Sequence, residues 1–148
     1  NTLAFMMLVR RPTHYGAMHG YDIDHNAIDL ANKITDTWQH SFPKVYNHVM
    51  DVNRVNFSCT GEESIFINCS VNHMDGNEWF DTVPSGRIVC IQSMDIDDVN
   101  PPWDVKYPTK NINDLLEKFK FSEVLFQGTR EIQYNTFSYN RLMVIGIK

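Results

Sequence analysis

The sequence predicts one α/β domain over residues 1–148, built on a mostly parallel, doubly wound sheet with helices on both faces. Three observations predict this class. Apolar runs alternate with segments of helical spacing, which is typical of parallel sheets with crossover helices. The runs at 64–74 and 87–95 are apolar enough for strands buried on both faces. The last two runs follow each other closely, which favours an antiparallel hairpin at the edge of the sheet.

The first third of the chain predicts helix, strand, helix and strand in turn. The second helix is the clearest, because Ile28, Ala31 and Ile34 recur at helical spacing and Asp24 stands where an N-cap would. Pro43 ends this unit. In chain order the four elements are expected at 1–11, 17–23, 25–40 and 44–51.

The remainder predicts a buried strand, a short helix, a second buried strand, a longer helix and the closing pair of strands. A polar connection with three prolines precedes the longer helix, in which Leu115, Leu116 and Phe119 share a face. These elements are expected at 64–74, 77–83, 87–95, 111–121, 122–134 and 140–148.

Composition excludes some classes of protein. The net charge of −5 argues against a protein whose main task is to grip nucleic-acid phosphates. No apolar run approaches the ~20 residues of a membrane span, and no signal peptide is visible, so we expect a cytoplasmic protein that does not enter a membrane. The odd set Cys59, Cys69 and Cys90 predicts buried free thiols. Cys-x-x-Cys pairs and metal-binding His spacings are absent from the sequence, so no metal site is predicted.

Polar residues follow three of the predicted strands. They lie in "GYDID" at 20–24, "VMDV" at 49–52 and "NCSVNHM" at 68–74. Ligands of open α/β sheets bind at the carboxyl ends of the strands. The sequence therefore predicts a ligand site assembled from these three segments.

At these positions the chain resembles the class I S-adenosylmethionine-dependent methyltransferases, which have a Rossmann-like sheet. The stretch "GYDIDHNAIDLANKI" looks like the family pattern G-x-D-x-S-x-x-x-I-x-x-A, and the resemblance implies that Asp22 holds the ribose hydroxyls of S-adenosylmethionine. It likewise implies that Asp51 contacts the adenine amino group. The run "FINCSVNHM" corresponds to the strand beside the sulfonium and the substrate, and "WFDTVPSGRIVCIQS" resembles the turn and strand that follow. The other cofactor-binding residues that the resemblance implies are Ile23, Val52, Asn68 and Ser70.

One family element is not found in residues 1–148, namely the first strand with its Gly-rich loop. In register, Asn1 falls just after that loop. We expect either that the residues upstream supply it or that another segment fills the gap, because a sheet lacking its central strand would expose two strand edges.

The two acids of "GYDID" have different interpretations. A carboxylate accepts hydrogen bonds from two vicinal hydroxyls, and such charge-assisted bonds are roughly twice as strong as neutral ones, which suits Asp22. Helix N-capping explains Asp24 fully. His73 is the candidate general base, since histidine titrates nearest neutrality, although packing or capping the turn would also explain it.

The leading hypothesis is an S-adenosylmethionine-dependent methyltransferase with a small-molecule acceptor. One alternative is a non-catalytic Rossmann-like domain that binds a nucleoside or serves in an assembly. Another is a nicotinamide-dependent enzyme, in which the ribose acid would look the same. A further alternative is an amino-group methyltransferase acting on nucleic acid, because "NPPW" (Asn100 to Trp103) resembles that group's Asn-Pro-Pro-aromatic motif, although it follows the fifth strand of the family order and not the fourth.

Overall fold

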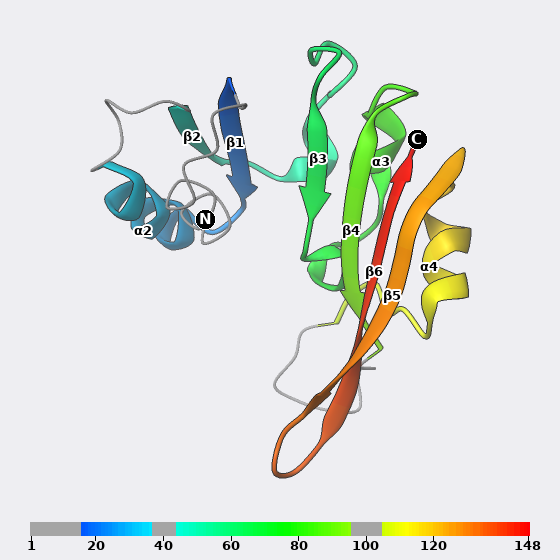
Figure 1. Ribbon diagram of the computed structural model, residues 1–148. Coiled ribbons are helices and arrows are strands. Elements are labelled where there is room, and N and C mark those ends of the chain that lie inside the picture. The colour runs from blue at the N-terminus through cyan, green and yellow to red at the C-terminus, as the bar shows by residue number, and fades with distance from the viewer. Residues whose placement is uncertain (1–15, 37–43, 96–104) are drawn as a thin grey trace. The chain divides into compact units, whose positions relative to one another are not determined.

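The computed structural model describes residues 16–36, 44–95 and 105–148, and the chain divides into two compact units (Figure 1). Unit 1 is Asn1–Val55 and unit 2 is Asn56–Lys148. The sequence-based expectation of a single domain over residues 1–148 stays a prediction. The predicted helix at 1–11 and the "NPPW" motif lie outside the described residues.

Unit 1 is a parallel β-α-β arrangement of β1 (Ala17–Asp22), α2 (His25–Thr35) and β2 (Lys44–Val49). Helix α2 begins where the sequence predicts, because the carboxylate of Asp24 accepts a hydrogen bond from the backbone N–H of Asn26 at 2.9 Å. The helix is described as far as Thr35, and residues 37–40 of the predicted helix lie outside the described residues. A short 3₁₀ turn, η2 (Val52–Arg54), follows β2.

Helix α2 covers one face of the β1–β2 sheet. It buries Ile28, Ala31 and Thr35, and the side-chain amide of Asn47 donates to Asn32 Oδ1 at 2.9 Å and to Thr35 Oγ1 at 3.3 Å. Successive side chains alternate across a strand, so His19, Tyr21, Tyr46 and His48 lie on the opposite face.

Two histidines on that opposite face form a cross-strand hydrogen bond. His19 Nδ1 and His48 Nε2 are 3.1 Å apart, while the ring centroids are 5.3 Å apart with planes only 5° from parallel. A nitrogen separation so much shorter than the centroid separation places the rings edge to edge, with both nitrogens between the centroids. One ring must therefore donate and the other accept.

Unit 2 contains a four-stranded sheet in the order β3-β4-β6-β5. Strand β3 (Ile65–Asn68) is parallel to β4 (Ile88–Met94), whereas β6 (Ser138–Ile147) is antiparallel to both β4 and β5 (Glu123–Gln133). The predicted antiparallel hairpin is confirmed, and β5 is the strand at the edge. The chain is a mixed α/β structure, but the doubly wound, mostly parallel sheet is not confirmed, because the sheets in the described residues are small and half of their strand pairings are antiparallel.

Two helices cover one face of this sheet, α3 (Glu78–Thr82) and α4 (Ile112–Lys118). Val89 and Ile91 of β4 and Val144 of β6 are fully buried on that face. Phe80 packs edge to face against Phe119, with ring centroids 5.3 Å apart, and so links the two helices. Each apolar side chain buried in this way contributes roughly 1.5–3 kcal/mol to stability. This energy favours the arrangement in which Val89 and Ile91 of β4 face the helices.

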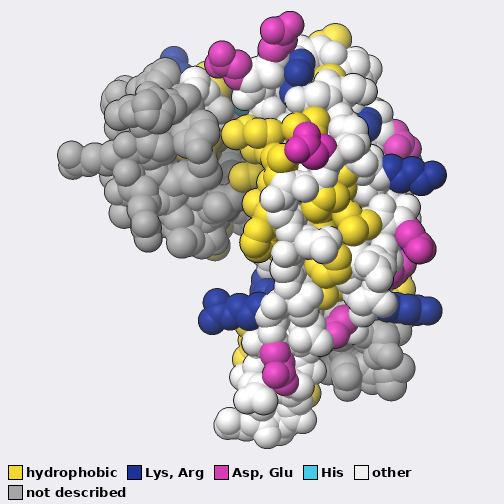
Figure 2. Space-filling view, turned by 45° about the vertical axis from the view of Figure 1, so that its right-hand side comes forward, with side chains coloured by type: hydrophobic (Ala, Val, Ile, Leu, Met, Phe, Trp, Pro, Cys, Tyr) yellow, Lys and Arg dark blue, Asp and Glu magenta, His cyan; other side chains and the backbone are white. Residues whose placement is uncertain are grey.

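The opposite face of this sheet, which we name the outer face, exposes Ile65, Ile67, Ile88 and Phe126. Figure 2 shows hydrophobic side chains gathered on this side of the sheet. Helices on both faces are therefore not seen in the part of the chain that the structure describes. The prediction of buried thiols is wrong: Cys59, in a turn, and Cys69, just beyond the end of β3, are exposed, and Cys90, on the outer face of β4, is only partly buried.

The predicted strand at 64–74 is also too long. β3 ends at Asn68, and residues Val71–His73 form a 3₁₀ turn, η3. The strand ends there because Asn68 Oδ1 accepts the backbone N–H of Ser70 at 2.9 Å, which turns the chain out of the ladder. The run stays apolar beyond the strand because Val71 is buried in the turn.

Candidate functional site

The carboxyl ends of β1 and β2 bring two of the predicted site residues to one edge of the unit 1 sheet. Asp22 is the last residue of β1 and pairs with Val49, the last residue of β2. The backbone N–H of Met50 donates to the carbonyl of Asp22 at 2.8 Å. This bond keeps the segments that follow β1 and β2 adjacent at the end of the sheet. Asp51 follows directly, at the beginning of η2.

Asp22 is exposed and its carboxylate is oriented by a local turn. Its Oδ1 accepts the backbone N–H of Asp24 at 2.9 Å. Within the described residues, its second carboxylate oxygen, Oδ2, makes no hydrogen bond or ion pair. Ile23 is 71% exposed, a high value for a large apolar side chain. The edge therefore presents a carboxylate beside an uncovered apolar side chain.

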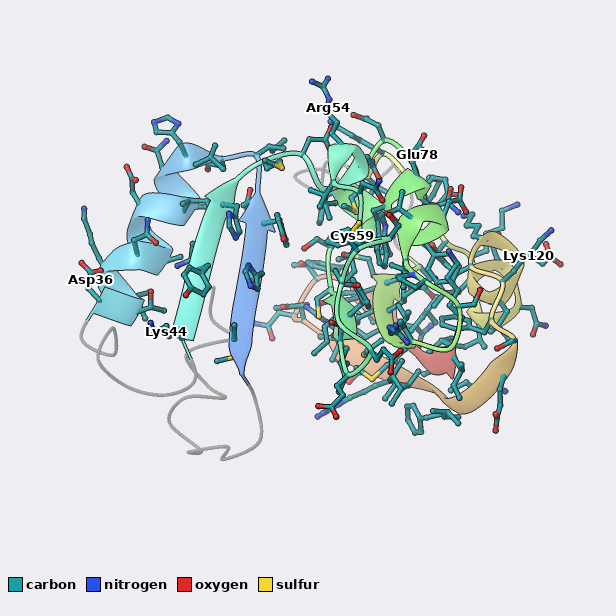
Figure 3. All side chains as sticks on the ribbon, turned by 90° about the horizontal axis from the view of Figure 1, so that it is seen from above. Asp36, Lys44, Arg54, Cys59, Glu78 and Lys120 are labelled. Carbon is teal, nitrogen blue, oxygen red and sulfur yellow. The ribbon has the colours of Figure 1, made fainter. Side chains whose placement is uncertain are left out.

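Both carboxylate oxygens of Asp51 have partners, unlike those of Asp22. Its Oδ1 accepts the backbone N–H of Asn53 at 3.0 Å, and its Oδ2 lies 3.5 Å from Nε of Arg54. The Arg54 side chain is 84% exposed and extends outward (Figure 3), so this ion pair contributes at most about 1 kcal/mol to stability. Val52, the first residue of η2, is partly buried.

Three predicted site residues come together in unit 2, at the carboxyl end of β3. Asn68 donates from Nδ2 to the sulfur of Met74 at 3.2 Å and accepts from Ser70. Ser70 precedes η3, and its carbonyl accepts the backbone N–H of His73 at 3.0 Å. Both Ser70 and His73 are exposed. The structure thus forms two groups, Asp22 with Asp51 and Asn68 with Ser70 and His73, each within its own unit.

Asn72 is a residue of this edge that sequence reasoning missed. It is 1% exposed, and its side chain joins η3 to the end of β4. Its Oδ1 accepts from the Ser93 hydroxyl at 2.8 Å and from the Met94 N–H at 2.9 Å, while its Nδ2 donates to the Met94 carbonyl at 2.9 Å. The only signal in the sequence is an amide inside an apolar run.

The carbonyl of Asn72 holds a further segment at the same edge. It accepts the backbone N–H groups of Lys106 at 2.7 Å and of Tyr107 at 3.0 Å. Buried polar groups that are fully hydrogen-bonded in this way specify one arrangement of the chain. Asn72 therefore positions the residues on either side of it, Val71 and His73, relative to β4.

Within residues 16–36, 44–95 and 105–148, no three His, Cys, Asp or Glu side chains gather in a way that would hold a metal ion. None of the helices in those ranges combines the length and the apolar character needed to cross a bilayer.

The sequence matches no protein-family model and no curated protein. The structure is similar to TehB from Haemophilus influenzae, with a TM-score of 0.60 and 14% identity over 88% of this chain and 49% of TehB, so the chain spans about half the length of that protein. It is also similar to the N-methyltransferase NodS from Bradyrhizobium japonicum WM9, with a TM-score of 0.61 and 10% identity over 98% of this chain and 82% of NodS.

NodS is also known in complex with S-adenosyl-l-homocysteine. That structure matches with a TM-score of 0.62 and 10% identity over 97% of this chain and 73% of NodS. Identities this low show the fold alone. The chain has a mixed α/β fold similar to that of the N-methyltransferase NodS.

Proposed function

We propose that the protein is an S-adenosylmethionine-dependent methyltransferase that acts on a small-molecule acceptor. The observation that carries the proposal is the pair of acids, Asp22 and Asp51, at adjacent carboxyl ends of two parallel strands. Ligands of α/β sheets bind at such ends. The fold supports the proposal, since NodS has a similar fold and binds S-adenosyl-l-homocysteine.

The residues at the β1–β2 edge fit this cofactor. Asp22 offers a carboxylate to the two ribose hydroxyls, and Ile23 offers an exposed apolar surface for one face of the adenine ring. Asp51 and Val52 would contact the rest of the base. Asn68 and Ser70, at the end of β3 in unit 2, stay predicted cofactor-binding residues.

In methyl transfer, the main task of the protein is to position the two reactants. The cofactor would supply a methyl group that moves to the acceptor nucleophile as the carbon–sulfur bond breaks, leaving S-adenosyl-l-homocysteine. Holding two reactants in line can lower the barrier by roughly 7–11 kcal/mol. His73, exposed in η3, would take the proton that the acceptor loses.

Calorimetric titration of the intact protein with S-adenosyl-l-homocysteine tests the proposal. Asp22→Asn should weaken binding by on the order of tenfold, because it removes the charge but keeps an oxygen for the Asp24 N–H. Asp29→Asn is the matched control, since it removes one exposed carboxylate from α2 of the same unit. Absence of heat with the wild-type protein, or equal binding by the Asp22 and Asp29 variants, would contradict the proposal.

The non-catalytic alternative predicts a different combination of results. A nucleoside-binding domain would bind S-adenosyl-l-homocysteine through Asp22, yet S-adenosylmethionine would not be consumed with any acceptor. The nucleic-acid alternative depends on Asn100 to Trp103, which the structure does not describe. Substitution of Asn100 by Ala would abolish methylation of DNA or RNA under that alternative and leave a small-molecule activity unchanged.

A further inference from the structure

Two arginines lie directly opposite each other at the carboxyl end of β4. Arg130 of β5 pairs with Arg141 of β6, and Arg141 pairs on its other side with Met94, the last residue of β4. Like charges directly opposite on antiparallel strands are unfavourable. None of the ion pairs in the described part of the chain involves either guanidinium. A bound anion would remove this repulsion.

The guanidinium of Arg141, an exposed residue, lies against Tyr139. It lies over the ring of Tyr139, with Cζ 5.9 Å from the ring centroid, and its Nε donates to the Tyr139 hydroxyl at 3.4 Å. Tyr139 is only 4% exposed, so it is a fixed support. A cation that is already oriented loses less entropy on binding an anion.

Hydrogen bonds between Asp95 and Asn140 join β6, the strand that carries Arg141, to the end of β4. Asp95 Oδ1 accepts the backbone N–H of Asn140 at 2.7 Å, and Oδ2 accepts its side-chain amide at 2.8 Å. The N–H of Asp95 in turn donates to the Asn140 carbonyl at 3.1 Å. These bonds fix β6 beside the carboxyl end of β4 at the position next to Arg141.

The charge of Arg141 acts at the end of β3 as well. Cys69 is exposed as a residue, but its thiol is partly desolvated, which raises the pKa of the thiol, and the nearby Arg141 guanidinium opposes that rise. Cys69 stands between Asn68 and Ser70, the two residues proposed for the cofactor site in this unit. Strand register gives the geometry: Asn68 pairs with Ile91, and Arg141 pairs with Met94, three residues further along β4 toward its carboxyl end.

An aromatic surface adjoins the two arginines. Tyr134, Phe137 and Tyr139, which we name the aromatic ladder, have ring planes within 15–19° of one another and centroids 4.9–6.3 Å apart. Met94, Val105 and Ile132 pack beside it, while Tyr134 is 54% exposed. Figure 1 shows that this part of the β5–β6 hairpin projects past the carboxyl ends of β3 and β4.

We propose that the acceptor is a planar acid, whose anionic group binds Arg141 and Arg130 and whose ring lies against the aromatic ladder. Arginine suits this task because its planar fork donates two parallel hydrogen bonds to a carboxylate or phosphate. The identification of this ligand as the acceptor rests on the proposed methyltransferase function. The anion site itself depends only on residues of unit 2.

Binding of para-aminobenzoate and of its neutral isostere para-aminobenzamide to the intact protein tests the inference. The acid should bind at least several-fold more tightly than the amide, and its affinity should fall as salt is added. Arg141→Gln should weaken binding of the acid on the order of tenfold, and Arg130→Gln by less, with the amide unaffected. Lys120→Gln is the matched control, since this exposed lysine lies just beyond α4, on the covered side of the sheet (Figure 3).

The two proposals fail separately. If S-adenosyl-l-homocysteine binds but the acid does not bind at millimolar concentration, or binds no better than the amide, the anion site is wrong and the proposed function stands. If Arg141→Gln and Lys120→Gln bind the acid equally, the anion site is wrong as well. If the acid binds through Arg141 and S-adenosyl-l-homocysteine does not bind, the anion site stands and the proposed function is wrong. Thermal unfolding of each variant shows that the fold is retained.

Discussion

Candidate site residues lie at the carboxyl edge of the β1–β2 sheet in unit 1 and at the carboxyl edge of the β3–β4 pair in unit 2, and different contacts stabilise the two edges. At the first edge, Asp22, Asp24 and Asp51 each bind a backbone N–H only two residues further along the chain. At the second edge, Asn72 binds residues of β4, and Asp95 binds Asn140, which is 45 residues away. Local bonds leave the first edge exposed, whereas distant bonds bury the centre of the second.

This difference predicts unequal costs of substitution at the two edges. Asn72→Leu should lower the free energy of unfolding by about 3 kcal/mol or more, because it leaves the Ser93 hydroxyl and both backbone groups of Met94 buried without their partner. Denaturant titration measures the change, with the exposed Asn113→Ala as control. A loss below about 1 kcal/mol would show that the second edge does not depend on Asn72.

Removal of the second long-range contact should cost less. Asp95→Ala should lower the free energy of unfolding by about 2 kcal/mol and speed hydrogen exchange at the Asn140 amide, since two bonds from Asn140 lose their acceptor. Asp95→Asn should restore most of the protection, because its amide oxygen still accepts the Asn140 N–H and its NH2 can donate to Asn140 Oδ1 once the Asn140 side-chain amide flips. Equal exchange rates in the Ala variant and the wild type would refute this role for Asp95.

Substitutions at the β1–β2 edge should lower the free energy of unfolding by less than those at the β3–β4 edge. Asp24→Ala should lower the free energy of unfolding by about 1 kcal/mol, the ordinary cost of losing a helix N-cap, and Asp24→Asn should lower it by far less. Circular dichroism during thermal unfolding measures both variants. If Asp24→Ala proved as costly as Asn72→Leu, the distinction between the two edges would not hold.

The smallest expected effect concerns the His19–His48 pair of unit 1. Burial lowers the pKa of His19 below 6.5, and the adjacent His48 lowers it further. The unfolded chain therefore takes up a proton at His19 before the folded chain does, so stability is present above pH 6.5 and declines as the pH falls from there through the lowered pKa. His48→Gln should flatten this decline, measured as the unfolding temperature against pH. An unchanged profile in the variant would mean that His48 does not contribute.

Much of unit 1 could be predicted from the sequence because its features are local. The spacing of Ile28 and Ala31, the N-cap at Asp24 and the short strands before and after α2 depend on neighbours a few residues away. The acids at the strand ends follow from the same pattern. What they bind is not local, so Asp22 as a cofactor ligand stays a proposal.

Unit 2 could be predicted only in part. The sequence indicates that β5 and β6 pair, but it does not indicate that β6 lies between β4 and β5, because strand order depends on contacts between segments far apart in the chain. It also gives no sign that the strand at 64–74 stops at Asn68, since Val71 is buried in a turn and keeps the run apolar.

The sequence by itself determined the mixed α/β class, the capped helix α2 and the closing antiparallel pair, because period and capping are properties of adjacent residues. Only the tertiary structure decided that Arg130 faces Arg141 and that Asn72 binds Met94. Both depend on strand register, in which a shift of one residue moves every side chain to the other face. The candidate acceptor site is therefore a product of register, whereas the candidate cofactor acids are a product of local sequence.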